Sequence, residues 1–163
     1  MKKFKLTSEF IVDISGVKLF RIKALIEFGN VKAGDLGGYI EKEENLSHMG
    51  NAWVSGNAQV SGDARVSGNA RVSGDAQVFG DARVSGNAQV SGDKDYAYAH
   101  GFGSCNRTTT FFRLKDGDVG VRCGCFYGTL AQFRDNVCET HGETKKAQEY
   151  LMLADLMDFR FKN

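Results

Sequence analysis

A strict six-residue pattern of apolar and polar positions fills the middle of the chain. Valine recurs at every sixth position, and alanine follows four residues after each of the first six valines. The valines are Val54, Val60, Val66, Val72, Val78, Val84 and Val90, and the alanines are Ala58, Ala64, Ala70, Ala76, Ala82 and Ala88. A glycine followed by Asn or Asp completes each unit, which predicts a short strand and then a sharp corner. This period is typical of a parallel β-helix and fits neither a heptad nor a leucine-rich repeat.

The same phase extends backwards into less regular sequence. Steps of six from Val54 place His48, Lys42 and Leu36 at the inward position. Three units of six residues, about 18 residues in all, close one coil of such a helix. We therefore expect residues 36–95 to form a short left-handed parallel β-helix, whose two open ends need caps.

Folding the sequence at 18 residues stacks Asp63 on Asp81 and Arg65 on Arg83. Polar ladders of this kind keep a solenoid hydrated and fix its register, and we expect acid and base columns to offset each other. Phe79 departs from the pattern, because a serine usually occupies its position. An outward ring there predicts a contact with another chain or with a ligand.

The flanking segments supply the caps. Residues 1–35 contain β-rich runs joined near Asp13 to Gly16, which predicts an N-terminal β cap. Residues 96–163 predict a ββαα module: a hairpin in RTTTFFRLKDGDVGVRCGCFYG, then a helix capped by Thr129 and ended by Gly142, then a second amphipathic helix. The expected fold class is therefore mainly β, with helices only at the C-terminal end.

Charge and composition narrow the possible partners. The 163 residues carry 21 Lys and Arg against 20 Asp and Glu, a formal net charge of +1. A balance this even argues against binding a nucleic acid polymer or a membrane surface through overall charge. The basic start MKKFKLTSEF lacks the apolar core of a signal peptide, and no apolar run reaches transmembrane length. We expect a cytoplasmic protein with reduced cysteines.

A glycine-containing stretch that leads into the predicted hairpin has the residue types that an anion requires. Hydroxyls, guanidinium groups and flexible backbone N–H groups bind phosphate, and aromatic side chains stack on bases. The candidate ligand-binding residues are Tyr98, His100, Ser104, Asn106, Arg107, Thr108, Thr109, Thr110 and Arg113. The spacing matches no fixed phosphate loop, and a polar loop entering a strand has the same composition.

Two other kinds of chemistry were weighed. Cys123, Cys125, Cys138 and His141 have the donor types for a tetrahedral zinc site, but their spacing matches no strong zinc signature. No metal or cofactor is therefore predicted. Many hexapeptide-repeat proteins are trimeric acyltransferases that use a histidine as general base. The histidines are His48, His100 and His141, and His100 has no evident acidic partner in the sequence.

Several segments together carry a family resemblance. KAGDLGGYIEKEENLSHMGNAWVSGNA, the SGDARV-type units and RTTTFFRLKDGDVGVRCGCFYGTLAQFRDNVCETHG resemble a set of hexapeptide-repeat proteins encoded by bacteriophages, prophages and gut bacteria. The resemblance covers nearly the whole chain. It implies a phage-type accessory protein acting in the host cytosol, and such proteins often counter host defence by sequestering a nucleotide immune signal without cleaving it.

The leading hypothesis is therefore a non-enzymatic binding protein, an oligomer and most simply a homotrimer, that sequesters an anionic small molecule such as a nucleotide immune messenger. The alternatives are a hexapeptide-repeat acyltransferase and a protein-binding inhibitor or structural rod. The first alternative requires turnover of an acyl donor, and the second requires neither ligand nor turnover.

Overall fold

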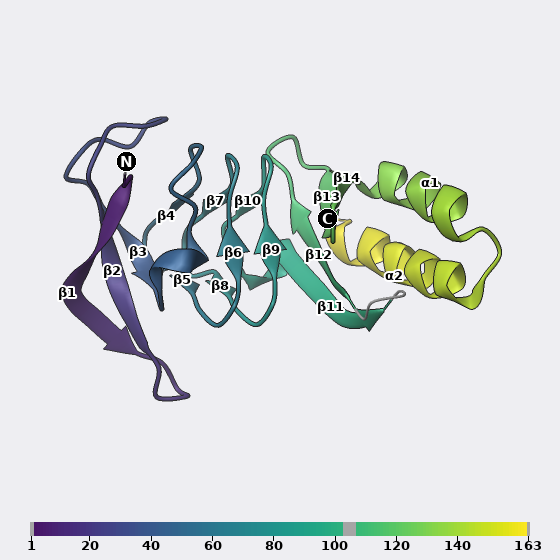
Figure 1. The fold of residues 1–163 in the computed structure, drawn as a ribbon, viewed down its shortest axis with the longest axis horizontal. Helices are drawn as coiled ribbons and strands as arrows, with labels where there is room; N and C mark the ends of the chain where they lie inside the picture. The colour runs from purple at the N-terminus through teal and green to yellow at the C-terminus, as the bar shows by residue number, and fades with distance from the viewer. Residues whose placement is uncertain (1, 103–106, 163) are drawn as a thin grey trace.

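The computed structural model describes residues 2–102 and 107–162. The molecule is elongated, with a twisted antiparallel sheet at the N-terminal end, a coil of very short strands in the middle, and a sheet covered by helices at the C-terminal end (Figure 1). The fold is mainly β, and its helices α1 and α2 lie in the C-terminal part of the described chain.

The central coil is a solenoid of two-residue strands, each placed where the six-residue period predicts a strand. These strands are β4 (Trp53–Val54), β5 (Gln59–Val60), β6 (Arg65–Val66), β7 (Arg71–Val72), β8 (Gln77–Val78), β9 (Arg83–Val84) and β10 (Gln89–Val90). They pair in parallel at an offset of 18 residues, so β6 pairs with β9, β5 with β8, and β7 with both β4 and β10. The repeated valines and alanines are buried in the interior.

Glycine is required at the corners by close approach of successive coils. Gly68 has a φ of +65°, and a Cβ added to it would lie 2.8 Å from the backbone nitrogen of Gly86 in the next coil. A side chain at this position would therefore meet both backbone strain and a clash that the neighbouring coil cannot relieve.

The predicted phase of the first coil was wrong. Ile40 pairs with Val60 and Leu46 pairs with Val66, so these two residues, and not Leu36, Lys42 and His48, continue the inward valine columns. The offset there is 20 residues because LSHMGNAWV contains two more residues between its inward positions than a regular unit does. Leu36 is more than half exposed.

His48, one of the two extra residues His48 and Met49, attaches the N-terminal cap. The His48 ring stacks on Phe4 with centroids 4.2 Å apart, and its Nδ1 accepts a hydrogen bond from the Lys3 backbone N–H at 3.1 Å. The opposite ring nitrogen, Nε2, lies 3.1 Å from Glu43 Oε1. His48 therefore has a capping role, and its ring is held between cap and coil.

The N-terminal cap continues the solenoid as an antiparallel sheet. Strand β1 (Phe4–Val12) pairs with β2 (Lys18–Ala24), β2 pairs with β3 (Leu36–Ile40), and β3 pairs in parallel with β5 of the coil. The turn between β1 and β2 lies at Asp13–Gly16, as the sequence predicts, with Gly16 at a φ of +85°.

Lys3 closes the open end of the coil beneath this sheet. Its side chain is 1% exposed, and its Nζ donates to the carbonyl oxygens of Ala52 at 2.7 Å and Gly50 at 3.4 Å. The ammonium group also lies 4.6 Å from the centroid of the Phe28 ring. Burial, reinforced by the nearby positive charge of Arg71, lowers the pKa of Lys3 from 10.5 to about 8.

The C-terminal module is larger than the predicted ββαα unit. The expected hairpin is present as β12 (Arg107–Arg113) and β13 (Val119–Cys123), but β11 (Tyr96–Phe102) and β14 (Phe126–Thr129) extend it on either edge. Helices α1 (Leu130–His141) and α2 (Lys145–Phe161) follow. Thr129 caps α1 by accepting from the Gln132 N–H, and Gly142 ends it.

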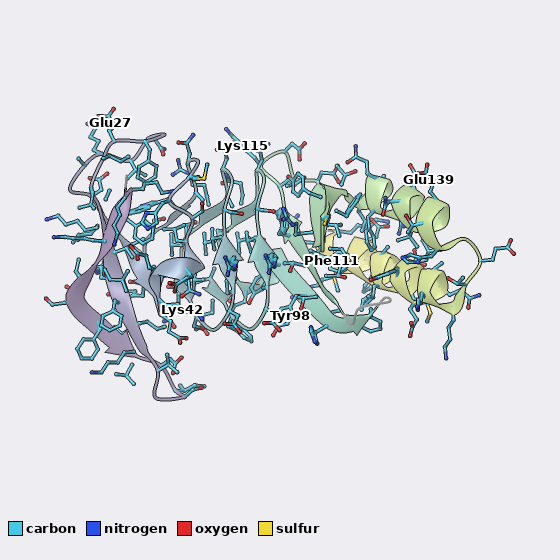
Figure 2. All side chains as sticks on the ribbon, in the orientation of Figure 1. Glu27, Lys42, Tyr98, Phe111, Lys115 and Glu139 are labelled. Atoms are coloured by element: carbon cyan, nitrogen blue, oxygen red, sulfur yellow. The ribbon has the colours of Figure 1, made fainter. Side chains whose placement is uncertain are left out.

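Strand β12 joins the module to the solenoid by presenting different residues to two cores. Phe112 packs among the solenoid valines and alanines, whereas Phe111 packs with Phe133 and Tyr150 in the core beneath the helices (Figure 2). Successive side chains of a strand point to opposite faces, which lets one strand serve both cores. Deletion of either ring would therefore loosen a different part of the chain.

A pH titration tests the capping role of Lys3. Between about pH 8 and 10 the unfolded chain binds a proton at this lysine that the folded chain has released, so the free energy of unfolding should rise with pH, by about 2 kcal/mol. Urea unfolding at pH 8, 9 and 10 measures the rise, and the Lys3→Met variant should lack it. Titration stops at pH 10 because burial also raises the pKa of Tyr96, which lowers stability at higher pH.

The matched control is Lys5→Met, two residues further on at an exposed position of β1. This variant should keep the pH dependence of the natural chain. An unchanged pH dependence in Lys3→Met would contradict the assignment.

Candidate functional site

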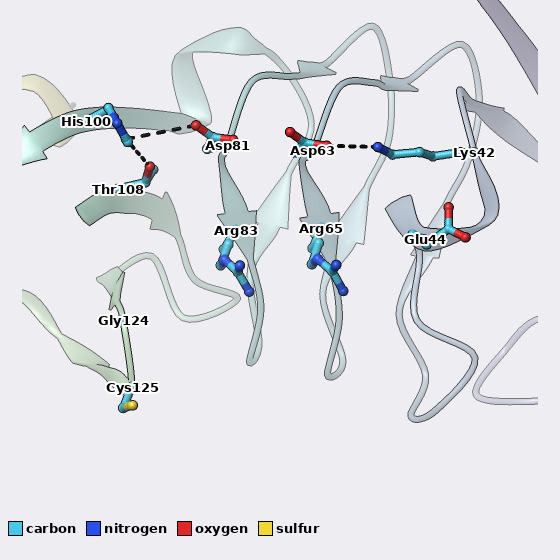
Figure 3. A pocket seen from close by; sticks show the side chains of 10 residues that line it. All are labelled: Lys42, Glu44, Asp63, Arg65, Asp81, Arg83, His100, Thr108, Gly124 and Cys125. Carbon is cyan, nitrogen blue, oxygen red and sulfur yellow. Dashed lines mark hydrogen bonds and ion pairs between the residues drawn. The ribbon is translucent and has the colours of Figure 1, made fainter. Parts of the chain in front are cut away.

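A groove of about 780 Å³ runs along the β6–β9 face of the solenoid (Figure 3). Its floor is formed by the acidic and basic side chains of two successive coils. Lys42 and Glu44 of the first coil border it on one side, and residues of the C-terminal module border it on the other. The lining residues are Lys42, Glu44, Asp63, Arg65, Asp81, Arg83, His100, Thr108, Gly124 and Cys125. In Figure 2, Lys42 and Tyr98 lie at opposite ends of the solenoid that the groove follows.

A second hollow of about 440 Å³ adjoins this groove. Glu44, Arg65 and Arg83 line both spaces, so the two form one continuous surface on either side of the arginines. The second hollow adds a cation from the C-terminal module and hydroxyls from the repeat. Its further lining residues are Glu43, Leu46, Ser47, His48, Val66, Ser67, Ser85 and Arg122.

The acidic column of the floor is partly neutralised by the walls. Lys42 Nζ lies 2.8 Å from Asp63 Oδ1, and this hydrogen bond lowers the pKa of the Asp63 carboxyl and raises that of Lys42. Asp81 has a weaker partner, because His100 Nδ1 lies 3.9 Å from its Oδ2. We predicted that the Asp and Arg columns would offset each other's charge. The hydrogen-bonded partner of Asp63, however, is Lys42 and not an arginine.

The basic column is the unusual feature of the groove. Arg65 and Arg83 are direct partners in the β6–β9 pairing, and their side chains extend side by side in the same direction (Figure 3). Within residues 2–102 and 107–162, neither guanidinium makes a hydrogen bond or ion pair. Like charges directly opposite each other on neighbouring strands repel, so the pairing of Arg65 with Arg83 is electrostatically unfavourable by itself.

A buried hydroxyl lies beside the arginines. Ser85 is 5% exposed, and its Oγ has no hydrogen-bond partner among the described residues. The equivalent Ser67, one coil earlier, is only partly buried. An unsatisfied buried hydroxyl costs stability, which is a common property of groups that meet a ligand.

The structure brings some of the sequence-predicted residues to the groove and separates others from it. His100 and Thr108 line it, with His100 Nδ1 2.7 Å from Thr108 Oγ1. Tyr98 lies two residues before His100 on β11 and contacts Phe79, with ring centroids 6.1 Å apart. Ser104 and Asn106 lie outside the described residues, and so does the side chain of Arg107.

Thr109 and Thr110 are inside the protein. Both are fully buried. Thr110 Oγ1 accepts a hydrogen bond from the Arg83 backbone N–H at 2.9 Å, and Thr109 Oγ1 donates to Cys123 Sγ at 3.2 Å. Because both hydroxyls are buried and bonded within the protein, Thr109 and Thr110 are not ligand-binding candidates.

Arg113 also has a structural role. Its Nε lies 3.1 Å from Asp95 Oδ1, and its Nη1 donates to the Phe161 carbonyl oxygen at 3.4 Å. Burial opposes ionisation of Asp95, but hydrogen bonds from Ser91 and Arg113 outweigh it and lower the pKa of the carboxyl. Arg113 thus ties the last coil to the end of α2.

Of the candidate zinc ligands, Cys123, Cys125 and His141 line one hollow, which Cys138 does not line. Cys123 contacts Thr109 and Tyr150, while Cys125 and Cys138 are exposed. Among the residues that the structure describes, no group of three His, Cys, Asp or Glu side chains could hold a metal ion.

His100 has an acidic neighbour that sequence reasoning missed, but its geometry differs from that of a general base in a triad. Both Asp81 and Thr108 approach the same nitrogen, Nδ1. A triad requires the carboxylate on one nitrogen and the hydroxyl on the other. The arrangement therefore holds the ring in place and gives no activated hydroxyl.

Sequence reasoning assigned Arg65, Arg83, Asp63 and Asp81 only to solvation and register. One signal could have found the arginines: the repeat accepts Gln at the same position, as in Gln59, Gln77 and Gln89, yet it stacks two arginines on one face. Arg122 and Lys42 come from outside the regular repeat, and no period places them near it.

Comparison with known proteins supports the solenoid. A family model described as a YdcK β-solenoid repeat matches residues 58–74, 64–78 and 76–92. These matches cover the regular units and less than half of the chain, so they identify a β-solenoid repeat protein. A comparison with curated proteins finds no match. No helix in the described part of the chain is both long and apolar enough to cross a membrane.

The cap formed by Thr110 can be tested with an isosteric change. Thr110→Val keeps the shape but leaves the Arg83 N–H without its acceptor, and it should lower the free energy of unfolding by about 1–3 kcal/mol. Thr108→Val is the matched control, because its hydroxyl bonds an exposed histidine and should cost less than 1 kcal/mol. Equal losses for the two variants in urea unfolding would rule out the cap.

Proposed function

We propose that this protein binds and holds an anionic small molecule in the solenoid groove without catalysing a reaction on it. The observation that carries the proposal is the unpaired, stacked pair Arg65 and Arg83. Paired parallel strands lie about 4.8 Å apart, so one phosphate-type anion can contact both guanidinium groups. Such an anion replaces repulsion with charge-assisted hydrogen bonds.

The surroundings favour an anion as well. Arg122 lines the adjoining hollow and adds a third guanidinium on the side of the C-terminal module. The Asp63 carboxylate, which would otherwise repel an anion, is bonded to Lys42. Ser85 offers an unused hydroxyl beside the arginines. Positive charge, a neutralised acid and a free hydroxyl together form a polar site for phosphate.

Binding without turnover fits the geometry of the groove better than acyl transfer does. His100 holds both of its polar partners on one ring nitrogen, so it lacks the base-and-hydroxyl arrangement of a nucleophilic site. A protein that only holds its ligand needs complementary charge and shape, which the groove supplies.

The biological part of the proposal follows from the sequence resemblance to phage and prophage hexapeptide-repeat proteins. In this proposal the coil is left-handed, the protein assembles as a homotrimer, and it acts in the host cytosol to sequester a nucleotide signal of host defence. The six-residue period supports the handedness, since hexapeptide coils of this type are typically left-handed. Half-exposed Phe79 is available to an oligomer contact or a ligand.

Titration calorimetry with pyrophosphate and a panel of mononucleotides and cyclic nucleotides tests the proposal. The double variant Arg65→Gln and Arg83→Gln should bind at least tenfold more weakly, because each lost charge-assisted hydrogen bond is worth about 1.5–3 kcal/mol. Glutamine occupies the same position in neighbouring units, so the coil should still fold.

Arg71→Gln is the control, because it removes the same charge from the same repeat position on the β4–β7–β10 face. Its affinity should equal that of the natural protein. The proposal fails if no anion of the panel binds, or if Arg71→Gln weakens binding as much as the groove variants do.

A further inference from the structure

Two successive coil segments of the groove are identical except at one residue. Residues 61–67 read SGDARVS and residues 79–85 read FGDARVS. In the second segment, an aromatic, an acidic, a basic and a hydroxyl side chain therefore follow one another at alternate positions. They are Phe79, Asp81, Arg83 and Ser85. The segment nearest the C-terminal module is the one that gains the ring.

The Phe79 ring adjoins the acidic end of the groove. It is 50% exposed and meets Tyr98 edge-on, with ring planes at 85°. Tyr98 and His100 are alternate residues of β11, and His100 lines the groove next to Asp81. The two rings do not line the groove, but they lie next to residues that do, with the half-exposed Phe79 ring two residues before Asp81. Exposed aromatic rings stack on bases.

Asp81 differs from Asp63 in having acceptor capacity left over. Asp63 is bonded to Lys42 at 2.8 Å, whereas the imidazole of His100 lies 3.9 Å from Asp81. Its side chain is 53% exposed at the groove. An ionised carboxylate has two oxygens that accept hydrogen bonds, and the adjacent hydroxyls of a ribose can donate to both.

We infer that the groove binds a nucleoside phosphate, with its base against Phe79, its ribose hydroxyls on Asp81 and its phosphate on Arg65 and Arg83. Along residues 79–83 an aromatic, an acidic and a basic side chain follow one another. This order matches the order of nucleobase, sugar and phosphate in such a ligand. The inference rests on the proposed function, because its phosphate contacts are those of the proposed anion site. It adds the side chains that contact the nucleobase and the ribose, and the direction in which the ligand lies.

Calorimetry with a graded ligand series tests each contact. The series is inorganic phosphate, ribose 5-phosphate, adenosine and cytidine 5′-monophosphates, and the 2′-deoxy forms of both nucleotides. The natural protein should bind the ribonucleotides about tenfold more tightly than ribose 5-phosphate, and more tightly than the deoxynucleotides. Both the adenosine and the cytidine nucleotide should bind more tightly than ribose 5-phosphate, because stacking on an aromatic ring is tolerant of base identity.

Two repeat-compatible variants separate the contacts. Phe79→Ser restores the serine of residue 61 and should remove the advantage of nucleotides over ribose 5-phosphate. Asp81→Asn introduces the residue found at 57, 69 and 87, and it should abolish the preference for ribonucleotides while phosphate binding stays. Phe159→Ser, which removes a more exposed ring from α2, is the control and should bind as the natural protein does.

The outcomes distinguish the inference from the function on which it rests. Equal affinity for ribose 5-phosphate and the nucleotides overturns the nucleoside assignment and leaves the anion site standing. A Phe79→Ser variant that binds inorganic phosphate and nucleotides with the same proportional loss also overturns it. Failure of the whole series to bind overturns both.

Discussion

A parallel coil of strands leaves unpaired backbone groups and an exposed apolar column at each end, and the rest of this structure depends on how those ends are closed. In the middle of the solenoid, backbone N–H groups at outward positions are bonded to carbonyls one coil further on, as Arg65 N–H is to the Ala82 oxygen at 3.0 Å. At the end the next coil is missing. There, Thr110 Oγ1 receives the Arg83 N–H, and the ammonium of Lys3 meets carbonyls at the opposite end. Unpaired buried backbone groups are costly enough to make such closures obligatory.

The caps also create the groove. The turn that contains Lys42 and Glu44 projects from the N-terminal side, and His100, Thr108 and the β13–β14 connection project from the C-terminal module. Between them, only the β6–β9 face carries stacked arginines. The same polar ladder on an open rod would be hydrated on all sides. Here it lies between the first coil and the C-terminal module, where it forms the floor of a groove in which Arg65 and Arg83 remain exposed.

The sequence predicted the repeat well and its irregular edges less well. The valine period located every short strand from β4 to β10, because inward packing leaves a fixed spacing. The insertion of His48 and Met49 was missed, since stepping by six continues through it without a visible break. Strand β11 was not predicted, because it is a strand through its pairing with β12, which lies outside the sequence of β11 itself. For the site, the composition of the Thr-rich strand suggested ligand binding, but Thr110 bonds the coil end and Thr109 bonds Cys123 inside the C-terminal module. Of the predicted side chains that the structure describes, only those of His100 and Thr108 line the groove.

The sequence by itself determined the coil period, the inward columns and the stacking of Arg65 on Arg83, because these follow from a local repeat. Only the tertiary structure decided which other side chains surround Arg65 and Arg83. Lys42 reaches Asp63 across 21 residues, Arg122 enters from a strand of another sheet, and the unpartnered Ser85 is covered by chain that no period relates to it. These placements depend on how two unrelated modules close the coil ends. That is a long-range packing solution, and no local pattern of residues specifies it.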